Sequence, residues 1–139
     1  PGVPRTQGSM EHIGAGRMKH SDSLVAWRSL VRDELRSYVR VNHPMVAPDD
    51  TWRGPVAVRC IFVRADGKGD IDKLARAVLD ALTESGVIAD DVQVVKLVCD
   101  RVERAGARRG DGVFVLVATA EDFYAEEMMT REIDGWVPR

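Results

Sequence analysis

Four aspartates in the middle of the sequence form two pairs that could bind a metal ion. Asp70 and Asp72 are separated by one residue, and Asp90 and Asp91 follow later in the chain. Carboxylates held near one point repel one another unless a cation lies between them. Hard oxygen ligands of this kind suit Mg²⁺, and Mn²⁺ is also possible. The pattern therefore predicts a metal-dependent enzyme that acts on phosphate esters.

Each pair also has an ordinary structural explanation. Asp70 is suited to cap a helix, and Asp72 is a favourable charge in its first turn. Asp90 and Asp91 are typical of a turn. The functional interpretation requires the pairs to meet. A helix over 72–85 is about 20 Å long, and residues 86–91 can span about 20 Å when extended. An extended return would just bring Asp91 back to Asp72; otherwise Asp91 completes a site elsewhere or across a dimer.

If the pairs meet, the chemistry of phosphodiester hydrolysis follows. A bound metal polarises a phosphate and lowers the pKa of water. A nearby cation, Lys73 or Arg76, can offset the developing charge on the phosphate. The sequence shows no Ser-His-Asp or Cys-His arrangement that competes as a source of the nucleophile. Its two isolated cysteines and three histidines lack the spacing of zinc ligands.

Hydrophobic periodicity predicts the elements that position these residues. Helices are expected over 21–41, 71–85 and 121–131, and Gly86 ends the second. Strands are expected over 56–63, 92–104 and 113–119, the last two joined by a basic hairpin loop at 105–112. Residues 1–20 are expected to be irregular. These elements predict one domain over residues 1–139.

The net charge of −2 hides an uneven distribution. Residues 1–45 and 101–109 are rich in arginine, whereas residues 70–100 contain seven acidic residues. A nuclease needs this division, with cations for the DNA backbone and carboxylates for the metal. Arg28, Arg32 and Arg36 form a row on the first helix that could follow phosphates or be solvated.

Features of secreted and membrane proteins are missing from this sequence. No secretory signal is visible, and the longest apolar runs are too short to span a bilayer. Cys60 and Cys99 lie in predicted strands and are expected to be reduced. We therefore expect a cytoplasmic protein without a membrane partner.

The central segment resembles the RusA family of Holliday junction resolvases. Residues 70–82 read D-I-D-K-L-A-R-A-V-L-D-A-L, and residues 86–94 read G-V-I-A-D-D-V-Q-V. The family pattern is D-x-D-N-x-x-K-x-x-x-D-A-L followed by D-D-x-Q-[IV]. Residues 1–9, P-G-V-P-R-T-Q-G-S, are similar to the P-x-P-x-x-x-G-S opening of phage-type members. A first strand, truncated or absent here, is then expected before Pro1.

The resemblance implies both a fold and an activity. The fold would be α/β of the α+β type, with a small mixed β-sheet and helices packed mainly on one face. The activity would be that of a magnesium-dependent endonuclease, which resolves four-way junctions and related branched DNA in recombination and repair. Two symmetric active sites of a homodimer would cut opposing strands. A phage-encoded member would act in the cytoplasm of the bacterial host.

The family roles transfer to named residues. Metal-binding aspartates fall on Asp70, Asp72 and Asp91. The catalytic lysine falls on Arg76, a departure, and Lys73, one helical turn earlier, is the candidate to replace it. Asp80 and Asp90 would orient the metal ligands or pair with Arg76. The expected DNA-facing residues are basic: Arg5, Arg17, Lys19, Lys68, Arg104, Arg108 and Arg109.

Two other functions stay open on the sequence. One is a catalytically silent protein of the same fold that binds junction DNA, for which Arg76 would be a first sign of lost activity. The other is a metal-dependent phosphotransferase acting on nucleotides. That enzyme would display a phosphate-binding glycine-rich loop before the helix, and residues 66–69 are too short to form one.

Overall fold

The computed structural model describes residues 4–5, 10–12, 18–20, 22–42, 51–65, 68–103 and 111–133. Within these ranges its elements, in chain order, are β1 (Met10–His12), β2 (Met18–His20), α1 (Asp22–Asn42), β3 (Val56–Arg64), α2 (Ile71–Ser85), the 3₁₀ turn η1 (Asp91–Gln93), β4 (Val94–Glu103), β5 (Gly112–Thr119) and α3 (Ala120–Ile133).

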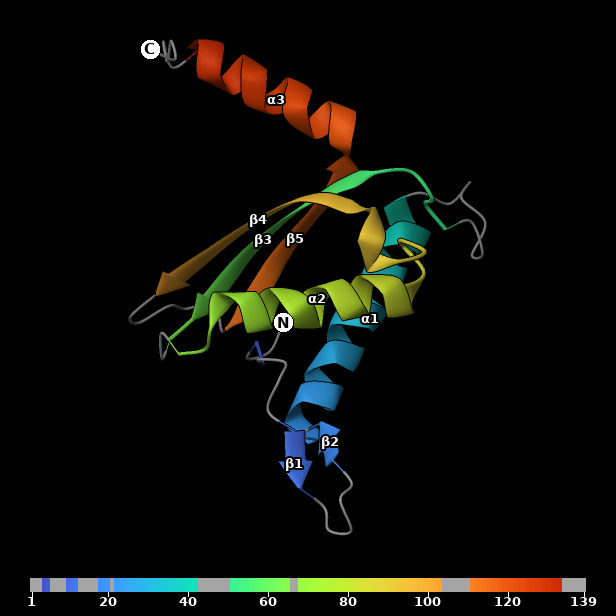
Figure 1. The fold of residues 1–139 in the computed structure, drawn as a ribbon, viewed down its shortest axis with the longest axis vertical. Coiled ribbons are helices and arrows are strands. Elements are labelled where there is room, and N and C mark those ends of the chain that lie inside the picture. Colours follow the sequence, from blue (N-terminus) through green and yellow to red (C-terminus); the bar gives the residue numbers. More distant parts are fainter. Residues whose placement is uncertain are drawn as a thin grey trace.

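The main sheet has the strand order β4-β3-β5, with β3 in the centre (Figure 1). β3 runs parallel to β4 and antiparallel to β5. The prediction of a hairpin between the last two strands is therefore wrong, because β5 pairs with the opposite edge of β3. β3 is apolar apart from two arginines, and in its central place most of its residues are buried.

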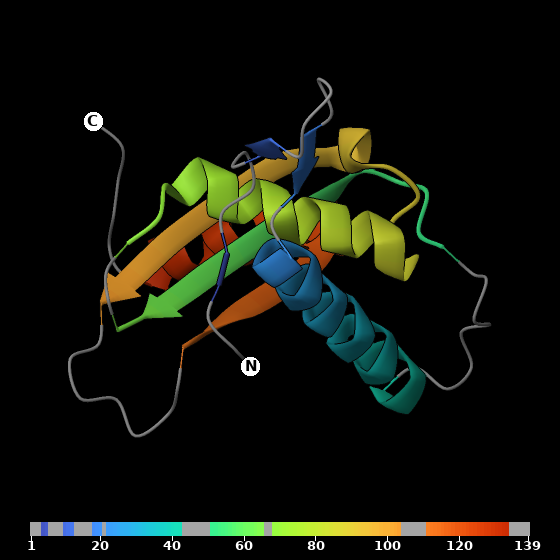
Figure 2. The ribbon, with the colours of Figure 1, turned by 90° about the horizontal axis from the view of Figure 1, so that it is seen from below.

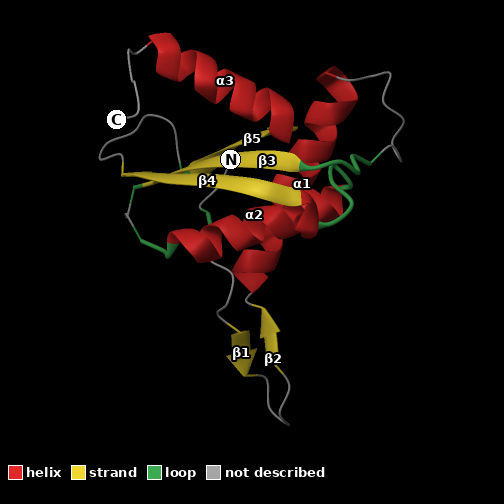
Figure 3. Cartoon of the chain, turned by 45° about the horizontal axis from the view of Figure 1, so that its top comes forward, coloured by secondary structure: helices red, strands yellow, loops and turns green. Residues whose placement is uncertain are grey.

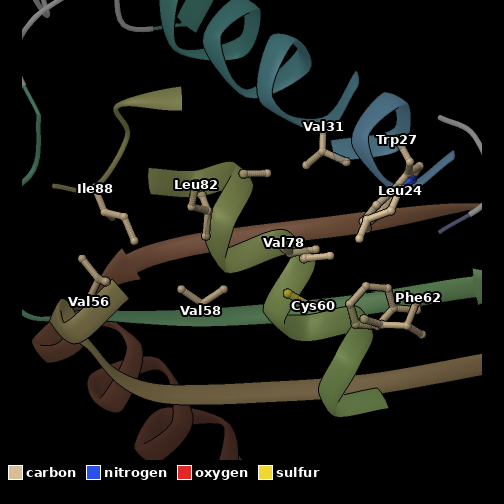
Figure 4. Close-up of a cluster of buried hydrophobic side chains, with 13 residues drawn as sticks. Leu24, Trp27, Val31, Val56, Val58, Cys60, Phe62, Val78, Leu82 and Ile88 are labelled. Atoms are coloured by element: carbon tan, nitrogen blue, oxygen red, sulfur yellow. The ribbon is translucent and has the colours of Figure 1, made fainter. Parts of the chain in front are cut away.

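Helices α1 and α2 cover one face of the sheet (Figure 2). They bury a continuous cluster in which Leu24 and Trp27 of α1 and Val78 and Leu82 of α2 pack towards Phe62 and its neighbours on β3 (Figure 4). α3 lies on the other side of the sheet from α2 (Figure 3). The α+β fold with a small mixed sheet is thus confirmed.

The arginines of α1 fasten it to the C-terminal half of α2. Arg28 pairs with Asp80 at 3.1 Å and with Glu84 at 2.9 Å. About two turns further along α1, Arg36 donates hydrogen bonds to the main-chain oxygens of Glu84 and Ser85, at 2.8 and 3.2 Å. Cations at this end of α2 also complement the helix dipole. Two members of the arginine row therefore hold the helices together, a role that the sequence did not suggest.

Two local predictions also need correction. The segment expected to be irregular contains β1 and β2, which pair antiparallel with Met10 opposite His20. The second predicted strand, expected from residue 92, begins later, at Val94, because the preceding residues form η1. By contrast, α2 spans the predicted residues, and Gly86 ends it in the left-handed conformation that glycine favours.

Two further features concern the cysteines and the composition of the helices. Cys60 and Cys99 are opposite each other on β3 and β4, and both are free thiols. Burial raises the pKa of each thiol, which keeps both protonated and unreactive. None of the described helices combines the length and the apolar composition needed to cross a bilayer.

Candidate functional site

The start of α2 presents an exposed carboxylate pair. Asp70 is the N-cap residue, with extended backbone angles, yet its side chain makes no capping hydrogen bond. Instead, its carboxylate lies 2.6 Å from the ammonium group of Lys73. Asp72 is exposed in the first turn of the helix. Both carboxylates therefore face solvent, where a ligand can reach them.

Lys73 sets the electrostatics at this end of the helix. Its hydrogen bond and charge lower the pKa of Asp70, and the more distant Arg101 lowers it further. The pKa of Lys73 is raised in return, first by Asp70 and to a smaller extent by Asp72. At neutral pH Asp70 is consequently ionised and Lys73 is a cation. A lysine held in this state can neutralise an anion but cannot act as a base.

A glycine turn places the start of α2 beside the end of β4. Gly69 has a φ of 99°, a conformation that residues with a side chain rarely adopt. Its main-chain oxygen accepts a hydrogen bond of 2.5 Å from Arg101, near the C-terminal end of β4. This contact fixes Asp70, the next residue, relative to the sheet.

The second aspartate pair lies in a turn organised by Gln93. Its side-chain oxygen accepts hydrogen bonds from the amides of Ala89 and Asp90, at 2.8 and 3.0 Å. Its side-chain nitrogen donates to the main-chain oxygens of Trp52 and Gly54, both at 2.9 Å. Sequence reasoning gave Gln93 no role, although its recurrence in the motif D-D-x-Q was a signal.

Asp90 completes the same turn. Its side chain accepts a hydrogen bond of 2.9 Å from the amide of Val92 and so caps η1. Asp91, the neighbouring residue, is exposed and has no such structural bond among the described contacts. The turn therefore uses one aspartate of the pair for its own stability and presents the other to solvent.

Within one chain, the two acidic pairs do not converge. Asp91 lines a shallow hollow with Asp80, Thr83 and Glu84, beside the C-terminal half of α2. Asp70 precedes Asp80 by ten residues of helix, or about 15 Å. Among the described residues, no three His, Cys, Asp or Glu side chains come together as a metal site. The expected meeting of the pairs is thus wrong for a single subunit.

The reason lies in the path of residues 86–90. They do not return extended along the helix but pair with Trp52, whose amide donates to the oxygen of Val87 at 3.1 Å. The amide of Ala89 donates back to the oxygen of Trp52 at 3.3 Å. Ile88 is fully buried in the core, so this segment is held at the C-terminal end of α2.

The other predicted site residues have varied positions. Arg76 is exposed on α2, and Asp80 pairs with Arg28 of α1 in place of the expected Arg76. Arg5 and Lys68 are exposed, as a DNA contact requires. The remaining DNA-facing candidates fall outside the described side chains: Arg17, Lys19, Arg104, Arg108 and Arg109.

The residues at the start of α2 suit a hard cation. Mg²⁺ is commonly held by one or two carboxylates, with water and substrate phosphate filling its other positions. Asp70 and Asp72 supply two such groups at an exposed helix start, where a phosphate can approach. Among the described residues of one chain, no third carboxylate joins them. A third ligand would therefore have to come from a second chain or from residues outside the described ranges.

Comparisons with known proteins agree with the sequence pattern. The family model described as Endodeoxyribonuclease RusA matches residues 1–115, which include both aspartate pairs. Comparison with curated proteins finds no similar sequence. The family match spans most of the 139 residues. The chain belongs to the RusA family of endodeoxyribonucleases.

Proposed function

We propose that the protein is a divalent-metal-dependent endodeoxyribonuclease that cuts four-way junctions and related branched DNA as a homodimer. The observation that carries this proposal is the pair of exposed carboxylates at the start of α2. The other acids on α2, Asp80 and Glu84, are joined to Arg28. Asp70 and Asp72 have no arginine partner in the described contacts, which leaves them available to a cation.

Four side chains in the N-terminal half of α2 and at its N-cap have roles in this proposal. Asp70 and Asp72 would hold the metal, Mg²⁺ or Mn²⁺, which when bound would polarise the scissile phosphate and make water more acidic. Lys73 remains protonated beside Asp70 and stabilises negative charge that develops on the phosphate. Arg76, one turn further along the helix, adds a second positive charge facing solvent.

Asp91 is the third metal ligand in this proposal, and its position explains the need for a dimer. It cannot reach Asp70 within its own subunit, so the complete ligand set requires two chains. A two-fold dimer then contains two equivalent sites, which matches the symmetry of a four-way junction. Exposed basic residues around the sites, Arg5 and Lys68 among them, contact the DNA backbone.

Cleavage of a synthetic four-way junction tests the proposal. We expect paired nicks on opposing strands with Mg²⁺ and none with EDTA, while junction binding persists in EDTA. A linear duplex of the same sequence serves as the substrate control and should be cut far more slowly. Tight binding without cutting in any divalent metal would instead identify a silent junction-binding protein. Cutting that EDTA does not affect would exclude the metal.

The departure from the family lysine offers a second check. Arg76→Lys retains the charge and should keep or raise the cleavage rate, whereas Arg76→Ala should lower it. A complete loss of cleavage in Arg76→Lys would mean that the guanidinium has a separate function here, since the two cations differ in hydrogen-bond geometry.

A further inference from the structure

We propose that Arg101 and Asp111 are positioning residues for the candidate metal site: they hold the main chain just before α2 and so determine where Asp70 and Asp72 lie. This inference rests on the proposed metal-dependent function. It follows from the exposure of the first turn of α2, from two hydrogen bonds that tie this region to the end of β4 and the start of β5, and from the atoms that those bonds use.

The start of α2 is not positioned by packing. All of residues 68–73 except Gly69 are exposed to solvent, and Leu74 is the first residue of the helix that is buried. The side chain of Asp70 makes no capping hydrogen bond that would tie it to the helix. Its ion pair with Lys73 joins two exposed groups, and such pairs contribute little to stability. Other contacts must therefore hold these carboxylates in place for a metal ion.

Arg101 supplies the first of these contacts. In the parallel ladder it is opposite Phe62 of β3, a core residue, so its side chain leaves β4 on the face that α2 covers. The start of α2 and the end of β4 lie at the same end of the sheet (Figure 1). There the guanidinium donates a hydrogen bond of 2.5 Å to the main-chain oxygen of Gly69. A carbonyl held next to Asp70 fixes the direction in which this residue leaves the turn.

Asp111 supplies the second contact. It lies directly before β5, and its Oδ1 accepts a hydrogen bond of 2.7 Å from the amide of Ala65, directly after β3. β3 and β5 are antiparallel neighbours, so this bond closes the end of their ladder. Asp111 thus holds the point at which the chain leaves the sheet, and Arg101 holds the point at which it enters α2.

Both contacts use main-chain atoms and do not occupy the carboxylates of the candidate site. Arg101 bonds the oxygen of Gly69, whereas Arg28 pairs directly with the carboxylate of Asp80. An arginine on a carboxylate competes with a cation, but an arginine on the neighbouring carbonyl only orients the ligand. Replacement of groups that orient metal ligands commonly changes metal affinity or rate by about ten- to a hundredfold.

Substitution of Arg101 gives the first test. Arg101→Ala removes the bond to Gly69 and should raise the Mg²⁺ concentration for half-maximal junction cleavage about tenfold or more. Arg101→Lys should stay within about threefold of wild type, because one carbonyl acceptor needs one donor and lysine can supply it. Arg59→Ala is the matched control. Its guanidinium pairs with Asp100 at 3.7 Å on the opposite face of the sheet, so its removal should leave the Mg²⁺ requirement unchanged.

Asp111 is tested by a similar pair of variants. Asp111→Asn keeps the Oδ1 acceptor and loses only the charge, whereas Asp111→Ala loses the acceptor as well. We expect the alanine variant to raise the Mg²⁺ requirement about tenfold and the asparagine variant to change it less than about threefold. An equal result for the two variants would mean that the bond to Ala65 does not matter, and would overturn the role assigned to Asp111.

Two readouts need no cleavage. Hydrogen exchange by NMR, without metal or DNA, should show faster exchange of the Ala65 amide in Asp111→Ala. In Arg101→Ala, exchange should be faster at the Leu74 amide, which donates to the oxygen of Asp70. Binding of Mn²⁺ alone, measured by electron paramagnetic resonance, should weaken about tenfold in Arg101→Ala. Similar melting temperatures of this variant and the control on β3 would show that the loss is not one of overall stability.

The outcomes separate this inference from the proposed function. An active wild type whose Mg²⁺ requirement and Mn²⁺ affinity do not change in Arg101→Ala would overturn the positioning role and leave the nuclease proposal in place. Weaker junction binding by Arg101→Ala in EDTA, with unchanged Mn²⁺ affinity, would make Arg101 a DNA contact and overturn the role equally. A wild type that binds Mn²⁺ more tightly than Arg101→Ala but never cuts would overturn the nuclease proposal alone. Absence of Mn²⁺ binding in the wild type would overturn both.

Discussion

The two ends of α2 carry the same kinds of residue in opposite states. At the C-terminal end, Asp80 and Glu84 are both bound by Arg28, and the last main-chain oxygens accept hydrogen bonds from Arg36. At the N-terminal end, Asp70 has a single lysine partner and Asp72 points to solvent. Carboxylates that pair with arginines help to pack the two helices, whereas carboxylates without an arginine partner are available to bind a ligand.

The same contrast separates the neighbours Asp90 and Asp91. Asp90 is engaged in capping η1, while Asp91 is exposed beside it. Residue type alone therefore does not identify a metal ligand in this protein. What distinguishes the candidates is whether another part of the fold already satisfies their oxygens.

A matched pair of substitutions tests this contrast, and we expect from it the largest effect. Asp72→Asn and Glu84→Gln each replace a carboxylate with an amide, at opposite ends of α2. Asp72→Asn should reduce junction cleavage about a hundredfold or more, since a lost metal ligand removes several kcal/mol of transition-state stabilisation. Glu84→Gln should leave the cleavage rate within about twofold. Single-turnover rates at saturating Mg²⁺ make the comparison.

Thermal unfolding supplies the control for both variants. Each should change the free energy of unfolding by about 1 kcal/mol or less, because one removes a first-turn charge and the other a half-exposed ion pair. Equal loss of cleavage in the two variants would show that the ends of α2 do not differ in function.

A smaller effect, on stability, is expected at the turn that positions Asp91. Gln93→Leu removes four hydrogen bonds, so the main-chain oxygen of Gly54 loses its described donor and the amide of Asp90 loses its described acceptor, which should cost about 2 kcal/mol. The control is Val92→Ala, at the adjacent and largely exposed position, which should cost under about 0.5 kcal/mol. Urea unfolding measures both. Similar losses in the two variants would mean that the Gln93 hydrogen bonds do not organise the turn.

The sequence predicted local features well and long-range ones less well. Its apolar spacing identified α2 to the residue, because a buried helix face and a glycine end signal are encoded locally. The run 56–63, apolar apart from Arg59, correctly predicted a strand. The position of β5, beside β3 on the edge opposite β4, was missed. Two successive strands joined by a turn-rich loop predict a hairpin, and no local feature of the sequence contradicts that prediction.

The candidate site shows the same limit. The acids and their spacing identified the family, but their convergence depended on the path of residues 86–90. That path is set by hydrogen bonds between Trp52 and the segment around Ile88, across more than thirty residues of sequence. Arg28 likewise meets Asp80 only through the packing of two helices. Such contacts are long-range, so periodicity and motif spacing carry no information about them.

The smallest expected effect concerns the proton on Asp70. Lys73 lowers its pKa, so Lys73→Met should raise the pKa of this carboxyl towards its ordinary value.

Because the folded pKa of Asp70 is depressed, its pairing with Lys73 stabilises the fold above the ordinary carboxyl pKa, and this contribution disappears as the pH falls through the folded pKa. The stability difference between wild type and Lys73→Met should therefore vanish in acid. Carboxyl ¹³C titration by NMR measures the pKa of Asp70 directly in both proteins. An unchanged Asp70 titration would show that Lys73 does not hold this carboxylate in solution, and Asp70 would then be as open to a cation as Asp72.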